Sequence, residues 1–281
     1  MGKRLLSFLR QKPESIFALV VAFLLASLLL VYLIDVINIF DLRNRLYRDS
    51  NIPFFWFHWF LTPVENPLQW LTLSGVMYLY FHNAKIAHNH GEKETFRFWG
   101  LMAIGSTLML IEDSMDIRHG VRRFLQDATG GDPTGYGELA TLFELGYFAT
   151  IAMVITFALI WYRKVYWRQK KTKRYFVLGF IFYGIAVFSS WLGTAFQDRM
   201  QADGLYTVIG GKLASVVFSD QETLHLFGDN DFPVMPLEFY LMDRVYEESI
   251  ELLGATALLV AGLSFYLEHQ RQISETTSPE K

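Results

Sequence analysis

The chain contains no cysteine among its 281 residues, and charged residues make up only 19% of it. The absence of cysteine excludes disulfides, cysteine-ligated zinc, iron–sulfur clusters and thiol catalysis. Three other signatures are also missing from the sequence: a phosphate-binding glycine loop, a serine-nucleophile elbow and a zinc-protease helix. We therefore do not expect the enzyme classes that depend on these motifs.

Hydrophobic residues make up 52% of the chain and aromatic residues 16%, which is typical of an integral membrane protein. A helix that crosses a membrane needs about 20 predominantly apolar residues. Apolar segments of about this length recur along the chain, and we expect an all-α bundle of six transmembrane helices. The segments are 16–40, 68–86, 96–114, 139–162, 175–196 and 245–269.

The remaining segments divide the chain further. We expect residues 1–269 to form the transmembrane domain, with 197–244 as an extracytoplasmic connector or cap within it, and 270–281 as a polar cytoplasmic tail. The β-branched run at 206–218 predicts a small β-hairpin in this connector. The aromatic run at 54–60 suits the membrane–water interface, as a short helix lying in its plane.

The loop at 163–174 decides the orientation, because it is rich in lysine and arginine and contains no acidic residue. Cytoplasmic loops of membrane proteins carry such an excess of basic residues. With this loop inside and six spans, both termini are cytoplasmic. Anionic lipid accounts for a basic patch on that side better than nucleic acid does. We therefore expect the lipid bilayer as a partner, and no nucleic acid.

Two acidic stretches, 112–116 and 247–251, stand at the ends of apolar segments, one closing the third and one opening the sixth. Because successive helices alternate in direction, both stretches lie at the outer membrane level. Ionisable groups at membrane depth are costly, and they are usually functional or paired. The residues predicted to converge at this level are Glu112, Asp116, His119, Glu144, Asp198, Glu248 and Glu251.

The spacing of these residues favours a metal site. Carboxylate-bridged dimetal bundles combine ligand pairs at i and i+3 with single glutamates from other helices. Asp116 and His119 have this spacing, as do Glu248 and Glu251. We therefore predict a divalent-metal site made of the seven residues, with Mn, Fe, Ca or Zn as candidate ions. Glu247 is then the candidate general base toward metal-bound water, acting on a lipid-linked or periplasmic substrate.

Two other interpretations remain open. Arginines at the same level could pair with the acids in an interfacial salt-bridge network, and the protein would then be a structural or assembly subunit. Alternatively, the acids could share protons, because either protons or a cation relieve the repulsion among close carboxylates. That arrangement is typical of a cation or proton transporter. The apolar composition of the third and sixth segments below the acids disfavours a path across the membrane. The arginines are Arg118, Arg122, Arg123, Arg199 and Arg244.

The sixth segment has two further features. Small residues along it predict close packing against neighbouring helices. His269 lies at its inner end, where the sequence shows no evident companion for it. The small residues are Gly254, Ala255, Ala257, Ala261 and Gly262.

The stretches Asp113 to His119 and Glu247 to Gly254 resemble uncharacterised prokaryotic polytopic membrane proteins. In those proteins an Asp-Glu pair stands several residues before a histidine on one helix, and the last helix opens with a Glu-Glu-x-x-Glu-like pattern. The resemblance covers the third to sixth segments and departs at Gly120, where those proteins tend to have a glutamate. It implies a shared outer site and a multi-pass protein of the prokaryotic plasma (inner) membrane, with no activity attached.

Overall fold

The computed structural model describes residues 12–48, 55–115, 138–195, 205–217 and 241–277, and five further positions between 117 and 127. For some helical residues, Glu144 among them, only the backbone is described. Every element in the described residues is helical, and they contain no strand. The fold is therefore all-α, as the sequence predicts.

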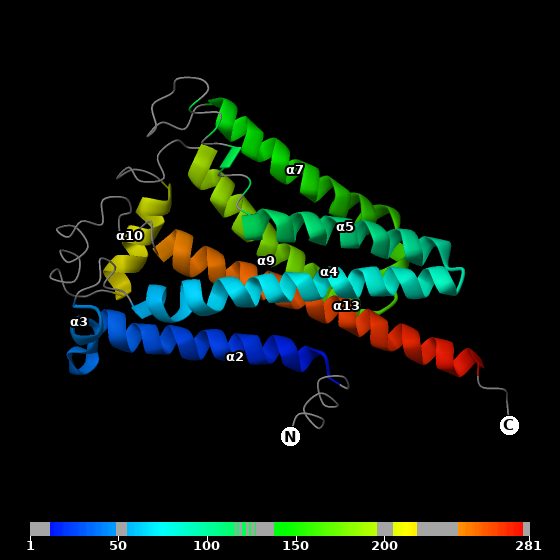
Figure 1. Ribbon diagram of the computed structural model, residues 1–281, viewed down its shortest axis with the longest axis horizontal. Helices are drawn as coiled ribbons and strands as arrows, with labels where there is room; N and C mark the ends of the chain where they lie inside the picture. The colour runs from blue at the N-terminus through cyan, green and yellow to red at the C-terminus, as the bar shows by residue number, and fades with distance from the viewer. Residues whose placement is uncertain are drawn as a thin grey trace.

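Six long helices make up most of the described chain and run along its long axis (Figure 1). They contain between 18 and 30 residues each, or about 27 to 45 Å at 1.5 Å per residue. Their bounds are α2 Glu14–Val31, α4 Asn66–Asn89, α5 Lys93–Met115, α7 Glu138–Trp161, α9 Lys170–Ala195 and α13 Glu248–Thr277.

Shorter elements extend or connect these helices. Three π-helical segments continue or precede long helices: η1 Tyr32–Val36 after α2, η3 Phe57–Glu65 before α4, and η4 Leu241–Glu247 before α13. The remaining elements are η2 Ile39–Asp41, α3 Leu42–Leu46, α8 Arg163–Trp167 and α10 Leu205–Val217. The α4–α5 turn closes on Gly91, whose positive φ of 72° suits a residue without a side chain.

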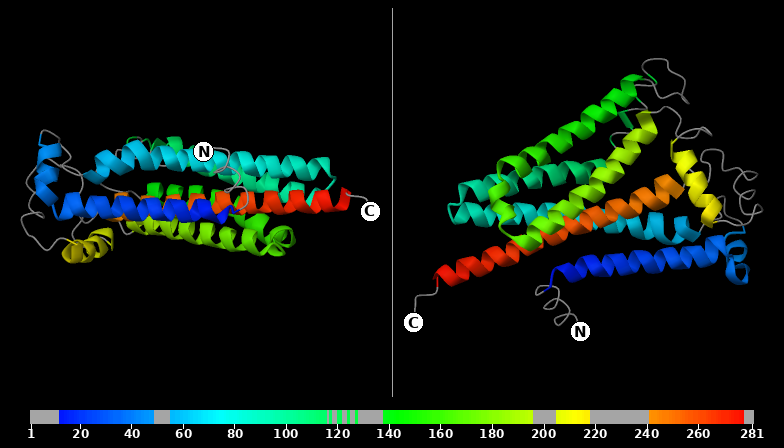
Figure 2. Two further views of the ribbon diagram at one scale, coloured as in Figure 1. Left: turned by 90° about the horizontal axis from the view of Figure 1, so that it is seen from below. Right: turned by 180° about the vertical axis from the view of Figure 1, so that it is seen from behind.

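Helix α13 is the central element of the bundle. It packs against α9 and α4 and also contacts α2, whereas α7 contacts α5 and α9 at the opposite edge. The views from below and behind show the same order (Figure 2). The end that carries α3 and α10 thus contains the start of α4, the end of α5 and the start of α13. The opposite end contains the α4–α5 turn and α8.

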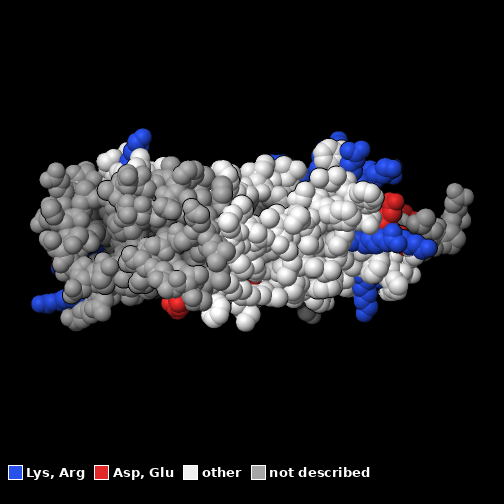
Figure 3. Space-filling view, turned by 90° about the horizontal axis from the view of Figure 1, so that it is seen from above, with Lys and Arg blue, Asp and Glu red and all other residues white. Residues whose placement is uncertain are grey.

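Two stretches of the described chain are long and apolar enough to cross a membrane, namely Glu14–Val36 and Leu241–Glu275. A shorter apolar helix covers Leu145–Trp161. The middle of the face drawn in Figure 3 is uncharged where it is described, and lysine and arginine gather near the end that carries the α4–α5 turn. An uncharged band beside a basic end is typical of a membrane protein.

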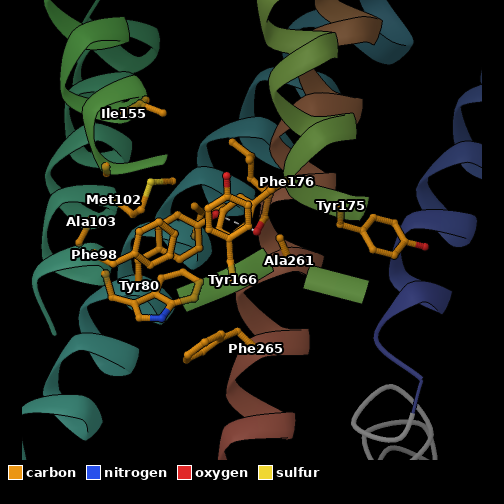
Figure 4. Packing of buried hydrophobic residues seen from close by; sticks show 14 of the residues in the cluster. Tyr80, Phe98, Met102, Ala103, Ile155, Tyr166, Tyr175, Phe176, Ala261 and Phe265 are labelled. Carbon is orange, nitrogen blue, oxygen red and sulfur yellow. Dashed lines mark hydrogen bonds between the residues drawn. The ribbon is translucent and has the colours of Figure 1, made fainter. Parts of the chain in front are cut away.

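An aromatic cluster occupies the middle of the bundle (Figure 4). The rings of Tyr80 and Trp99 have centroids 4.9 Å apart, and those of Trp99 and Phe265 are 4.7 Å apart. The Tyr80 hydroxyl donates to the Leu258 carbonyl at 3.0 Å. This bond satisfies a polar group that is fully buried, and it ties α4 to α13.

Small residues bring α13 close to α9 and α4. A side chain on Gly254 would meet the Tyr183 ring at 2.6 Å, and one on Gly262 would meet the Tyr80 ring at the same distance. Ala255, Ala257 and Ala261 are fully buried. The prediction that these small residues permit close helix packing is confirmed.

The predicted hairpin at 206–218 is wrong, because Leu205–Val217 forms the helix α10. Gly210 and Ala214 are one helical turn apart and both buried, and α10 packs against η4 and α9. Strand propensity depends strongly on tertiary surroundings, and here the helix packing outweighs the β-branched composition.

The second helix begins earlier than the apolar pattern indicates. The aromatic run continues through η3 directly into α4, and Trp56 and Phe60 are fully buried against Leu24 and Leu252. The segment therefore packs in the bundle and does not form a separate short helix. Its π-helical turns accommodate Pro63, which cannot donate in a regular α-helical ladder.

Asp35 joins the first helix to this second one. Its carboxylate oxygens accept from the backbone N–H groups of Phe55 at 2.6 Å and Trp56 at 2.9 Å. These donors lie in the first turn of the second helix, where backbone N–H groups have no intrahelical acceptor. Past Asp35 the chain turns through left-handed residues at 38, 40 and 41, so the first helix ends at Val36 and not at residue 40.

We expect Gly179→Val to destabilise the fold, because a side chain there would meet Leu258 at 2.7 Å and the Gly254 carbonyl at 3.2 Å. Overpacking of this kind typically costs about 1–3 kcal/mol. The matched control is Gly184→Val on the same helix, where no atom lies within 4 Å. Thermal unfolding in mild detergent should show a lower midpoint for the Gly179 variant only. Equal midpoints would contradict the close α9–α13 approach.

Candidate functional site

Four acidic side chains meet at the α3–α10 end of the bundle, and we call them the carboxylate cluster: Glu65, Asp113, Glu248 and Glu251. They come from η3, α5 and α13, and they lie near enough to act on one another electrostatically. Two neutral groups join them, the Gln69 amide on α4 and the Tyr183 hydroxyl on α9. Four long helices therefore contribute to one site.

Gln69 connects the acids of different helices. Its Nε2 donates to Asp113 Oδ1 at 2.7 Å and to Glu251 Oε2 at 2.9 Å. The side chain is only 1% exposed, and its Oε1 has no hydrogen-bond partner among the described residues. Both amide hydrogens thus hold carboxyl groups, while the amide oxygen is buried and unsatisfied.

Glu65 is the most enclosed acid of the cluster. It is fully buried, and neither carboxyl oxygen has a hydrogen-bond partner in the described part of the chain. Glu65 precedes the apolar segment that starts at Leu68. Burial, with the nearby Glu251 and Asp113, raises the pKa of Glu65 to about 9, although Arg244 and a close carboxyl–carboxyl approach of Glu248, which does not meet hydrogen-bond geometry, act in the opposite direction. Burial and the neighbouring acids therefore favour the neutral, protonated form of Glu65 at neutral pH.

Arg244 provides positive charge at the edge of the cluster. Its Nη1 lies 3.5 Å from Glu248 Oε1, and its Nε lies 3.1 Å from Asp243 Oδ2. The Arg244 backbone carbonyl also accepts from the Trp56 indole at 3.2 Å, which fixes the start of α13 against the second helix. One partly exposed guanidinium therefore pairs with Glu248, while Glu251 and Asp113 meet the Gln69 amide.

Tyr183 is placed by the close α9–α13 crossing. Its ring lies against Gly254, and its hydroxyl is buried without a hydrogen-bond partner among the described residues. Glu251 and Asp113 lie near enough to this hydroxyl to act on it electrostatically. A phenol both donates and accepts, so Tyr183 can serve either protonation state of the acids beside it.

The structure describes four of the eight residues predicted from the sequence. Glu248 and Glu251 belong to the cluster. Glu112 is described but lies next to Asp113, which is the residue of this pair that meets Gln69. Glu247 is buried beside Glu248. Three of the remaining predicted residues lie outside the described residues, namely Asp116, His119 and Asp198. For Glu144 the backbone is described but not the side chain.

The described residues contain no group of three or more histidines and acids that could hold a metal ion. Two histidines in the second half of α4 make aromatic contacts. The His82 ring lies 6.0 Å from Tyr78 and 5.5 Å from Tyr266 between centroids, and the His88 ring lies 5.2 Å from Phe96.

The sequence analysis missed Glu65, Gln69 and Tyr183. Glu65 and Gln69 carry a signal that was available, because they are four residues apart and so share a helix face at the start of an apolar segment. Tyr183 carries none, because a tyrosine inside an apolar run has the same pattern whether it faces lipid or a site.

Comparison with known proteins gives no relatives: no family model, no curated protein and no solved structure matches the chain. The chemistry must therefore come from the residues themselves. Carboxyl groups, an amide and a phenol, without a thiolate, favour protons or hard cations. A buried group of acids can also be neutralised by protons alone.

We expect Glu65→Gln to change how stability depends on pH. Glutamate in the unfolded chain ionises near 4.5, whereas folded Glu65 keeps its proton up to about 9. Its contribution to stability is therefore full below about pH 4.5 and is lost as the pH rises toward 9. Glutamine is neutral in both states, so the variant should match the wild type near pH 5 and exceed it at pH 8.

Thermal unfolding from pH 5 to 9 in mild detergent measures this difference. At pH 8 the midpoint should differ by several degrees, since 1 kcal/mol corresponds to about 2–4 °C in a chain of this size. Glu94→Gln, at an exposed acid near the start of α5, is the matched control and should leave the pH dependence unchanged. Parallel curves for wild type and Glu65→Gln would contradict the protonated state.

Proposed function

We propose that the protein is a multi-pass protein of the plasma membrane, with six spans and both termini in the cytoplasm. The described long helices, with α2 counted together with its continuation η1, are each about 34 Å long or more, enough to cross a hydrocarbon core of about 30 Å. The basic residues at 163–174 support a cytoplasmic location for the α7–α9 connection. On this topology the carboxylate cluster lies at the outer membrane level.

We propose further that the carboxylate cluster binds protons and transfers them as part of transport across the membrane. The observation that carries this proposal is the fully buried Glu65, which has no hydrogen-bond partner among the described residues and lies beside carboxyls held by Gln69. Acids in this position are far less costly when neutral. A proton is therefore the cation that this arrangement accepts most readily.

The neighbouring groups supply the means of loading and releasing a proton. Gln69 donates to Asp113 and Glu251, so it stabilises their ionised forms while Glu65 remains neutral. Arg244 acts in the same direction on Glu248 at the edge of the cluster, against the larger effect of burial and of the nearby Glu65 and Glu251. Acids with different environments differ in proton affinity, and a proton can then pass between them in steps.

A divalent metal ion is the second candidate, favoured by the unsatisfied Gln69 Oε1. Rotation of the amide would turn this oxygen toward Asp113 and Glu251, where it could join carboxylate ligands around Mn, Fe, Ca or Zn. The protein would then be a metal-dependent enzyme acting on a lipid-linked or periplasmic substrate. Glu247, buried beside Glu248, would be the base in that case.

Proton flux into proteoliposomes tests the first candidate. With an interior-negative potential set by potassium and valinomycin, the wild type should acidify an internal pH dye. Glu65→Gln and Glu251→Gln should reduce the initial rate at least tenfold, because neither glutamine can exchange a proton. Glu94→Gln is again the matched control.

Elemental analysis of the same preparation, purified without chelator, tests the metal candidate. The enzyme would be favoured if the wild type contained stoichiometric metal, Glu251→Gln lost that metal, and the wild type showed no proton flux.

The proposed topology makes a separate prediction. A reporter inserted in the 163–174 loop should behave as cytoplasmic, and one at Gly211 in α10 as external. The physical reason is the cost of moving the basic loop across the membrane against the usual distribution of charge. A single introduced cysteine serves as the reporter at each position, because the chain has no cysteine of its own. Its reaction with an impermeant thiol reagent shows on which side of the membrane it lies. The reverse result would put the carboxylate cluster on the cytoplasmic side.

A further inference from the structure

A titratable pair separate from the carboxylate cluster lies at the opposite end of the bundle. His269 on α13 is 6% exposed, and its Nε2 lies 2.8 Å from Oε1 of Glu92, in the α4–α5 turn. The Glu92 side chain is 38% exposed, so the pair joins the buried interior to the surface at this end. Histidine is the side chain that most readily gains and loses a proton near neutral pH.

The pair and the carboxylate cluster are separated by about the thickness of a membrane core. Glu251 and His269 are 18 residues apart on the same helix, a distance of about 27 Å along its axis. The hydrocarbon core of a bilayer is about 30 Å thick. Helix α13 therefore carries a proton-binding group near each side of the membrane.

Buried polar groups lie between these two ends. The Tyr80 hydroxyl donates to the Leu258 carbonyl at 3.0 Å, and Asn83 Nδ2 donates to the Gly262 carbonyl at 3.2 Å. These carbonyls lie about 10 and 16 Å from Glu251 along the helix axis. The sequence analysis took the interior below the acids as apolar, and the α4 face of α13 is in fact polar at these points.

Three of the interior polar atoms have no hydrogen-bond partner among the described residues: Asn83 Oδ1, Trp99 Nε1 and Ser264 Oγ. Buried polar groups of this kind are usually satisfied by internal water. Trp99 packs against Phe265 with ring centroids 4.7 Å apart, and Phe265 packs against His269 at 5.3 Å, so this region lies beside the pair. Water held at these atoms would bring a hydrogen-bonded path to the histidine.

We propose that His269 and Glu92 form the cytoplasmic end of a proton path whose outer end is the carboxylate cluster. This inference rests on the proposed function. A proton leaves a carboxyl of the cluster and passes between α4 and α13 through water bound at the polar groups there, whose amide and indole N–H groups orient that water but do not carry the proton. It arrives on the His269 imidazole, where the Glu92 carboxylate stabilises the imidazolium, and is then released to water at the exposed side of Glu92. No other bond forms or breaks.

The charged surroundings of the pair are consistent with this role. On α13 itself, Glu268 and Arg271 flank His269, and they pair with each other at 3.7 Å on the exposed side. From the α4–α5 turn the described contact with the imidazole is Glu92. A purely structural pair would tie α13 to this turn, and its removal would change stability without selectively changing proton transfer.

Two variants test the path in the proteoliposome assay. His269→Gln and Glu92→Gln each keep a hydrogen-bonding group and remove the ability to carry the proton or to stabilise the imidazolium. Each should lower the initial proton flux at least tenfold. His90→Gln, an exposed histidine in the same turn, is the matched control and should keep wild-type flux. The Glu65-dependent change of thermal stability with pH should be unaltered in all three variants.

The outcomes separate the two proposals. Wild-type flux in both His269→Gln and Glu92→Gln overturns the inner path and leaves the outer proton site intact. Absence of flux in the wild type overturns the proposed function itself. If His269→Gln loses flux together with its fold, judged by gel filtration and thermal unfolding, the partly exposed Glu92→Gln decides the question. A tenfold loss of flux in folded Glu92→Gln then supports the inner path, and wild-type flux overturns it.

Discussion

The cost of burying charge governs the arrangement at the α3–α10 end of the bundle. Four carboxyl groups share a region in which Glu65 is fully enclosed and Arg244 is the described guanidinium that pairs with a member of the cluster. If all four were ionised, their repulsion and desolvation would oppose folding by several kcal/mol. Gln69 resolves part of the conflict by donating to two of them, and a proton on Glu65 resolves another part. Folding is therefore coupled to the charge state of the four carboxyl groups at this site.

The glycine contacts of α13 set the geometry on which the cluster depends. Because Gly254 and Gly179 let α9 and α13 approach closely, the Tyr183 ring reaches across Gly254 toward the acids. On the other side, Gly262 admits the Tyr80 ring, whose hydroxyl then reaches the α13 backbone. A wider spacing would leave both hydroxyls in lipid or in apolar packing. The small residues thus determine which polar groups enter the interior.

Much of the fold could be predicted from the sequence, because long apolar segments between polar ones specify helices with little ambiguity. The approach of third-helix and sixth-helix acids also follows from helix direction, and Asp113 and Glu251 do meet at Gln69. The choice of Asp113 could not be predicted, since adjacent residues point about 100° apart and the helix phase depends on packing. Glu65 was missed because Pro63 and Pro67 usually mark a helix boundary, whereas here the helix continues from η3, which contains Pro63, into α4, whose second residue is Pro67. The His269–Glu92 contact joins residues 177 apart in the chain, which no local pattern reveals.

Helix α2 is fastened at both of its ends. Asp35 binds the start of the second helix, and Glu14 pairs with Lys171 on α9 at 2.9 Å. Between these points the apolar stretch is 23 residues long, or about 34 Å. Its outer side presents leucines such as Leu25 and Leu29. A helix held in this way adjusts its tilt less independently when the surrounding bilayer is thinner or thicker than its apolar length. The surrounding lipid then takes up part of the mismatch. A change in bilayer thickness therefore acts on the Asp35 hydrogen bonds and on the start of the second helix, which contains Glu65.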